Sequence, residues 1–171
     1  MEPALKTSIW QQFGAAIDTL NEAIDLCPDP LWTVALWKDE ENAAYGQFWF
    51  IAYHTLYWLD LFLTGSREGF APPPPFVRGR LPDQPYSKEQ ISSYLKQCRQ
   101  KAQAAIDSLT DEKAYQICTF EWMEPTYLEL QLYSMRHVQE HAAQLNLALG
   151  QRDLPASDWI PKARDEGSQR S

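Results

Sequence analysis

Hydrophobic side chains recur every three or four positions in four long stretches of the chain, which predicts four helices. The first stretch runs from about Pro3 to Leu26, and Pro3 suits an early helical position, where a backbone N–H is not needed. Pro28 and Pro30 end this helix, because proline cannot donate the backbone hydrogen bond and restricts the residue before it. The apolar stripe consists of Ile9, Phe13, Ala16, Ile17, Leu20 and Ile24.

The second helix is expected to follow the acidic cluster at 39–42, because carboxylates in a first turn oppose the positive end of the helix dipole. It extends to about Thr64 and is ended by Gly65. The apolar run at 48–63 is shorter than the roughly 20 residues that cross a bilayer, so we expect a buried helix and no membrane span. The core face of this helix reads Ala43, Gln47, Phe50, Ile51, His54, Trp58 and Leu61.

The third helix opens at Ser87, where Ser87 and Gln90 fit a capping box. Before it lies a long loop, residues 65–86, in which four consecutive prolines at 72–75 favour an extended backbone. A loop of this length either crosses over the length of a bundle or covers a pocket, and the sequence leaves both interpretations open. The apolar stripe of the third helix contains Ile91, Leu95, Cys98, Ala102, Ala105 and Leu109.

The fourth helix starts near Pro125 or Thr126, follows a connector at 110–124, and ends before Gly150. The connector includes a short piece at 119–122 that suits an extended backbone. We therefore predict an all-α protein in which residues 1–150 form a four-helix bundle, with a long proline-rich crossover loop between helices two and three. The tail at 151–171 is expected to pack as far as Trp159 or Ile160 and then to fray. The inward face of the fourth helix reads Leu130, Ser134, His137, His141, Leu145 and Ala148.

Composition narrows the class of partner and the compartment. Hydrophobic residues make up 44% of the chain, which is enough for a core. The net charge is −8 and no basic stripe is visible, so we expect no nucleic-acid partner. The three cysteines show no Cys-x-x-Cys spacing, and the amino terminus lacks the pattern of a signal peptide. These features predict a cytoplasmic protein, and we interpret Cys27, Cys98 and Cys118 as small buried hydrophobic residues.

The three histidines of the chain carry the candidate chemistry. His137 and His141 are four residues apart on the inward face of the fourth helix, and His54 lies on the core face of the second. Two imidazoles from one helix and a third from a facing helix form three corners of a tetrahedral metal site. The alternative is that each is a hydrogen-bonded core residue, but three buried imidazoles then need a partner for every ring nitrogen. The pattern therefore favours a shared divalent transition metal.

Residues beside the histidines are candidates for supporting roles. Tyr57 flanks His54, and a tyrosine hydroxyl near a metal can orient a ligand. Glu140 lies about 60° from His137 around the helix, so it is either a general base, a partner of a ligand or a solvated carboxylate. The sequence places no general base and identifies no catalytic residue.

The chain resembles the DinB-like (YfiT-like) superfamily of four-helix-bundle proteins. That family has one histidine in helix two and a His-x-x-x-His pair in helix four, often followed by Gly-Gln-Leu, and His54, His137 and His141 match these positions. Ala143, Gln144 and Leu145 stand where Gly-Gln-Leu would, so Ala143 departs from the family pattern. Gln144 joins Tyr57 and Glu140 as a candidate partner of the ligands.

The resemblance implies a metal-dependent enzyme with zinc or nickel, or alternatively iron or copper, on the three histidines. Some members of the family are thiol S-transferases or isomerases that use low-molecular-weight thiols, and the family often forms homodimers. We therefore expect thiol S-transferase-like chemistry on a small electrophile, with a small molecule as partner. The alternatives are a metal-dependent hydrolase, or a non-catalytic bundle that binds a metal or another protein.

Overall fold

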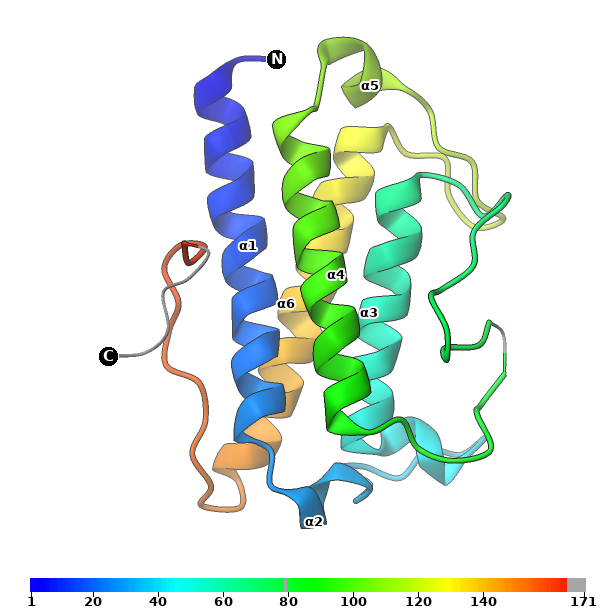
Figure 1. The fold of residues 1–171 in the computed structure, drawn as a ribbon, viewed down its shortest axis with the longest axis vertical. Coiled ribbons are helices and arrows are strands. Elements are labelled where there is room, and N and C mark those ends of the chain that lie inside the picture. The colour runs from blue at the N-terminus through cyan, green and yellow to red at the C-terminus, as the bar shows by residue number, and fades with distance from the viewer. Residues whose placement is uncertain (79, 166–171) are drawn as a thin grey trace.

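Four long helices form the body of the computed structural model, which describes residues 1–78 and 80–165 (Figure 1). Each of the first and second long helices contacts both the third and the fourth, so the four enclose one core. The predicted all-α, four-helix bundle is confirmed. No helix in the described part of the chain is long and apolar enough to cross a bilayer. The long helices are α1 (Pro3–Leu26), α3 (Phe48–Thr64), α4 (Lys88–Asp107) and α6 (Tyr127–Gly150).

Three short helical elements lie in the connections: α2 (Asp29–Trp32), η1 (Ala43–Gly46) and α5 (Asp111–Tyr115). The α5 helix begins where the Thr110 hydroxyl accepts a hydrogen bond from the Lys113 amide at 3.1 Å, within a segment that we expected to be a connector. After α5 the chain forms two antiparallel bridges, Ile117 with Thr126 and Phe120 with Met123. The extended piece expected at 119–122 is therefore only partly correct, because the chain turns at Glu121 and Trp122.

The predicted start of the second long helix is wrong, because α3 begins at Phe48 and not directly after the acidic cluster. The preceding residues form the η1 turn, in which the Asn42 side chain accepts from the Ala44 amide at 2.9 Å. This turn is held by tertiary pairing: the Leu36 amide donates to the Gly46 carbonyl at 2.7 Å. A Cβ atom at Gly46 would lie 2.4 Å from the Trp37 carbonyl oxygen, so only glycine permits this close approach.

Both interpretations of the loop at 65–86 describe part of its role. α3 and α4 run in the same direction, so the loop returns along the whole length of the bundle (Figure 1). It is fixed to the helices by the Tyr53 hydroxyl, which donates to the Val77 carbonyl, and by Phe76, whose ring stacks on Tyr94 at 4.5 Å. The same loop also supplies part of the wall of a cavity, described below.

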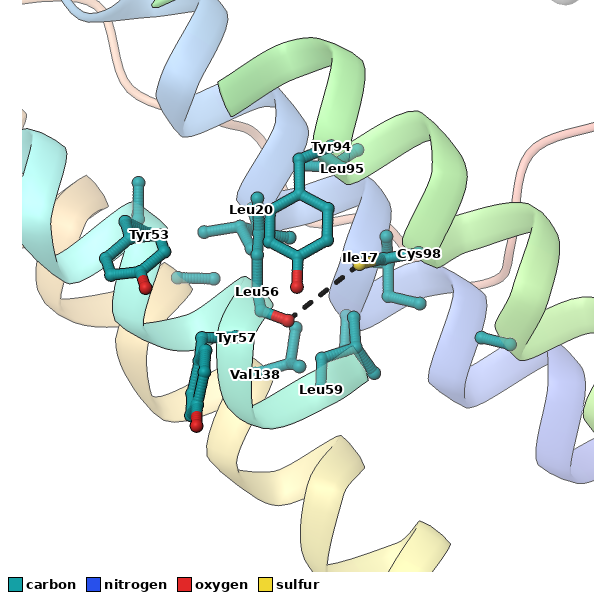
Figure 2. Packing of buried hydrophobic residues seen from close by; sticks show 14 of the residues in the cluster. Ile17, Leu20, Tyr53, Leu56, Tyr57, Leu59, Tyr94, Leu95, Cys98 and Val138 are labelled. Atoms are coloured by element: carbon teal, nitrogen blue, oxygen red, sulfur yellow. Dashed lines mark hydrogen bonds between the residues drawn. The ribbon is translucent and has the colours of Figure 1, made fainter. Parts of the chain in front are cut away.

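The core between α1, α3 and α4 is filled by aliphatic and aromatic side chains (Figure 2). Within it the Cys98 thiol donates to the Leu56 carbonyl at 3.8 Å. Cys27 and Cys118 are also buried and unpaired, which confirms the interpretation of the cysteines as small hydrophobic residues. Burial raises the pKa of Cys27 to about 12 and also raises the pKa values of Cys98 and Cys118, so these thiols stay protonated at neutral pH.

The C-terminal tail packs further along α1 than the sequence suggested. Ile160 is buried, but Trp159 is 81% exposed, so only one of the two expected anchors is used. Beyond them the Ala163 amide donates to the Gln11 carbonyl at 2.8 Å, and the Arg164 amide donates to Asp18 at 2.7 Å. Buried carboxylates on α1 hold this segment, which hydrophobic spacing does not reveal. The expected fraying of the last residues falls outside the described residues.

Candidate metal centre

The packing of α3 against α6 brings the three histidines together. His54 lies in the middle of α3, and His137 and His141 lie on successive turns of α6. All three side chains are partly buried, and their ring centroids are between 4.5 and 5.3 Å apart. The predicted convergence of the three residues on one point of the bundle is therefore present in the structure.

The Nε2 atoms of the three imidazoles face one another. His137 Nε2 is 3.3 Å from His54 Nε2 and 3.1 Å from His141 Nε2. One nitrogen from each ring lies within 4.8 Å of the other two. No other described group of three or more histidine, cysteine, aspartate or glutamate side chains has this geometry.

These separations suit a shared divalent ion. Bonds of about 2.0–2.1 Å from zinc to imidazole nitrogen place neighbouring nitrogens about 3.3 Å apart in a tetrahedron and about 2.9 Å apart in an octahedron. The Nε2 atoms of His137 and His54 are 3.3 Å apart, which equals the tetrahedral value, and those of His137 and His141 are 3.1 Å apart, which lies between the two values. Three imidazole ligands also leave at least one coordination position for a water or a substrate. The residues present therefore fit a transition metal, and imidazole alone does not select which one.

Burial keeps His54 and His137 in the form that binds metals. Desolvation, together with the nearby His141 ring, lowers the pKa of His54 to about 4. Desolvation and the rings of His141 and His54 lower the pKa of His137 to about 3. Both imidazoles are therefore neutral at pH 7, and a neutral imidazole has a free lone pair for a cation.

Gln144 determines which nitrogen of His141 carries the proton. The Gln144 Oε1 atom lies 2.7 Å from His141 Nδ1, and this carbonyl oxygen can only accept, so Nδ1 donates. In the neutral tautomer that this bond selects, the Nε2 atom of His141 carries the lone pair and faces the other two rings. Metal-binding histidines typically donate their second N–H to an oxygen acceptor in this way.

Three buried polar atoms on α6 lack a hydrogen-bond partner in the described part of the chain, which the sequence could not show. His137 Nδ1, Ser134 Oγ and Gln131 Oε1 have no hydrogen-bond partner among the described residues. They lie at intervals of three residues, so they follow one face of the helix. The Gln131 amide group still donates to the Phe62 carbonyl at 3.0 Å. The sequence placed Ser134 and His137 on the inward face of this helix, which predicted their burial, but it did not indicate Gln131.

The other two candidates lie close to the histidines without contacting them. Tyr57 is buried in the wall of the cavity next to His54, and no hydrogen bond joins its hydroxyl to a histidine among the described residues. Glu140 is exposed on α6, and in the described structure it makes no hydrogen bond to the cluster. Of the three candidate partners, Gln144 alone makes direct contact with one of the histidines.

A cavity of about 480 Å³ opens beside the cluster, with His54 and His141 in its wall. Its other polar groups come from loops: Asp39 precedes η1, and Arg67 and Arg80 belong to the crossover loop. These residues could not be predicted as part of the site, because the sequence of a loop does not show which way its side chains point. The aromatic side chains of the wall are Trp37, Tyr45, Phe50, Tyr53, Tyr57 and Trp58.

An all-α bundle with three converging imidazoles has the features of a metal-binding helical protein. The family model of the DinB superfamily matches residues 12–145, which include all three histidines. The chain therefore belongs to the DinB superfamily. No curated protein matches the sequence.

Proposed function

We propose that this protein is a metal-dependent enzyme in which His54, His137 and His141 hold one divalent transition metal ion, zinc or nickel in preference to iron or copper. The observation that carries this proposal is the separation of their Nε2 atoms, 3.1 and 3.3 Å, which corresponds to neighbouring ligands of one ion. Neutral imidazoles and the acceptor at Gln144 add support, since both leave lone pairs directed at the same point.

A divalent cation in this position supplies a Lewis acid that lowers the pKa of a thiol or a water beside it. The chain offers no thiol of its own for this purpose, because all three cysteines are buried, protonated and absent from the cavity wall. The cavity instead leaves room next to His54 and His141 for a small molecule. We therefore propose that a low-molecular-weight thiol enters as a substrate and loses its proton to water. Its sulfur then forms a bond to a carbon of a small electrophile, and the leaving group on that carbon, such as chloride, departs with the bonding electrons, as in the thiol S-transferases of the family.

The experiment uses full-length protein without a histidine tag, loaded with one equivalent of Zn²⁺ or Ni²⁺. Monochlorobimane serves as the electrophile, and cysteine and glutathione serve as thiols. We expect conjugation that requires the metal and disappears after chelation. Metal-dependent cleavage of 4-nitrophenyl acetate without any thiol would instead favour a hydrolase. A bound metal with neither activity would favour a non-catalytic bundle, and less than about a tenth of an equivalent with no uptake would exclude the metal.

Replacing Gln144 with leucine is expected to weaken zinc binding by roughly 10- to 100-fold, the usual effect of removing a hydrogen-bond partner of a metal ligand. The substitution removes the acceptor of His141 Nδ1 and leaves the tautomer of that ring unfixed. Competition with a chromogenic chelator measures the affinity. Gln139→Leu is the matched control, because Gln139 is also on α6 and makes no described contact with the cluster. Equal losses in the two variants would show that Gln144 does not position His141.

A further inference from the structure

Aromatic side chains form much of the cavity wall, and six of them line it. Those nearest the histidines are in contact: the His54 ring is 6.1 Å from Phe50 and 6.2 Å from Trp58, and the Trp58 ring is 5.6 Å from Tyr57. Aromatic surfaces of this kind bind ligands that present a flat apolar face. A molecule lying along this wall has one end at the histidines and the other at the crossover loop.

The charges of the cavity are opposite in sign to the charge of the protein. The whole chain carries a net charge of −8, but the wall contains Arg67 and Arg80 against a single carboxylate, Asp39. Asp39 already accepts hydrogen bonds from the amides of Glu41 and Asn42, at 3.0 and 3.1 Å. The negative charge in the wall is thus partly satisfied by backbone donors, and the two guanidinium groups determine the local sign.

Neither arginine is fully paired within the protein. Arg80 is exposed and forms no ion pair with any carboxylate in the described part of the chain. Arg67 contacts Glu121 at 3.3 Å, but the Glu121 side chain is 82% exposed, and such surface pairs contribute little. The Arg67 Nε atom is buried and has no hydrogen-bond partner among the described residues. An unsatisfied buried donor is costly, but this atom has no surface open to the cavity, so the proposed contact with an anion involves the rest of the guanidinium group.

The guanidinium group of Arg67 is also held in place before any ligand arrives. It lies over the ring of Trp122, 5.2 Å from the centroid. This contact restricts the side chain, so less conformational entropy is lost when a ligand binds. Aromatic walls can attract cations as well, but two arginines in the same wall repel a cation and favour an anion.

We propose that the cavity binds an organic anion with a flat aromatic or similarly apolar body. Arg67 and Arg80 counter its charge, the aromatic wall holds its body, and its remaining end reaches toward His54 and His141. This inference rests on the proposed function, because it names the substrate class of the same site. It predicts that an uncharged molecule of the same shape binds more weakly.

Two fluorescent probes that differ by one anionic group test the proposal. 8-Anilinonaphthalene-1-sulfonate carries a sulfonate, and N-phenyl-1-naphthylamine is its uncharged counterpart. We expect Arg67→Gln/Arg80→Gln to weaken binding of the sulfonate about fivefold or more, the scale of two partly exposed charge pairs. Binding of the neutral probe should change less than twofold. Added salt should weaken only the sulfonate, because it screens charges and not apolar contacts.

Arg78→Gln is the matched control, because Arg78 is an exposed arginine of the same loop that does not line the cavity. Equal losses in Arg78→Gln, equal losses for the neutral probe, or no binding of the sulfonate would each overturn the proposal. If the double variant does not fold, the binding of the two probes is compared in Arg80→Gln alone, because replacing an exposed side chain should leave the fold intact. Sulfonate binding that depends on the arginines in protein that takes up no metal would support this proposal and contradict the proposed function. Metal uptake, together with sulfonate binding that does not depend on the arginines, would contradict this proposal and leave the proposed function standing.

Discussion

Replacing His137 with alanine is expected to weaken Zn²⁺ binding by roughly a hundredfold or more. Structural zinc sites gain about 10–16 kcal/mol from four ligands, so one ligand accounts for about 3 kcal/mol. His137 is the histidine to replace because its Nε2 atom lies within 3.3 Å of the Nε2 atoms of both others, so any ion shared by the three must contact it. Chelator competition followed by metal analysis of the purified variant measures the loss.

Glu140→Gln is the control for this substitution, because Glu140 lies on the same turn of α6 and is exposed. We expect its zinc affinity to stay within about twofold of the original, since it makes no described contact with the cluster. An unchanged affinity in His137→Ala would show that the three imidazoles do not share an ion. A loss in Glu140→Gln as large as in His137→Ala would place this carboxylate at the metal.

The melting temperature separates a catalytic metal from a structural one. A ligand that binds only the folded state stabilises it by RT ln(1 + [L]/Kd). For a catalytic site on a bundle that folds by itself, metal-free protein and His54→Ala should melt cooperatively, with the activity lost and the fold retained. A bundle that loses its cooperative transition in His54→Ala would instead show that the metal is part of the folding energy.

The helices could be predicted where their signals are local. The α4 helix starts at the predicted residue because Ser87 and Gln90 form the expected capping box within four residues of each other. The start of α3 could not be predicted in the same way. It depends on the pairing of Leu36 with Gly46, which is a contact between segments that hydrophobic periodicity treats as independent. Local preferences are overridden where such tertiary contacts satisfy the backbone.

The same distinction explains which parts of the site were predictable. His137 and His141 are fixed relative to each other by helical spacing, and burial of His54 follows from the apolar run around it. Gln144 was found through its place in the family pattern. Arg67 and Arg80 were missed, because they come from a loop whose path is determined by contacts such as Phe76 on Tyr94. Helix geometry thus reveals the candidate metal ligands, but not the loop arginines that we propose bind the substrate.

Replacing Asp18 with alanine is expected to destabilise the protein by about 3 kcal/mol, because it leaves a largely buried arginine without its partner. The Arg99 guanidinium donates to Asp18 at 2.7 and 3.3 Å, and the Arg164 amide donates to the same carboxylate at 2.7 Å. The substitution therefore breaks the pair between α1 and α4 and removes one of the contacts that hold the tail, whereas Glu22 still pairs with Arg164. For a chain of this size the melting temperature should fall by about 6–12 °C.

Asp29→Ala is the control, because Asp29 pairs with Lys88 at 3.5 Å and its side chain is 97% exposed. Its loss should stay below about 1 kcal/mol, as for other surface pairs. The double variant Asp18→Ala/Arg99→Ala should lose less than the sum of its single variants, because removing both charges leaves neither uncompensated. Trypsin should also cut at Lys162 faster in Asp18→Ala, since that segment is held through Arg164. Additive losses with unchanged proteolysis would show that the buried pair does not couple the tail to the bundle.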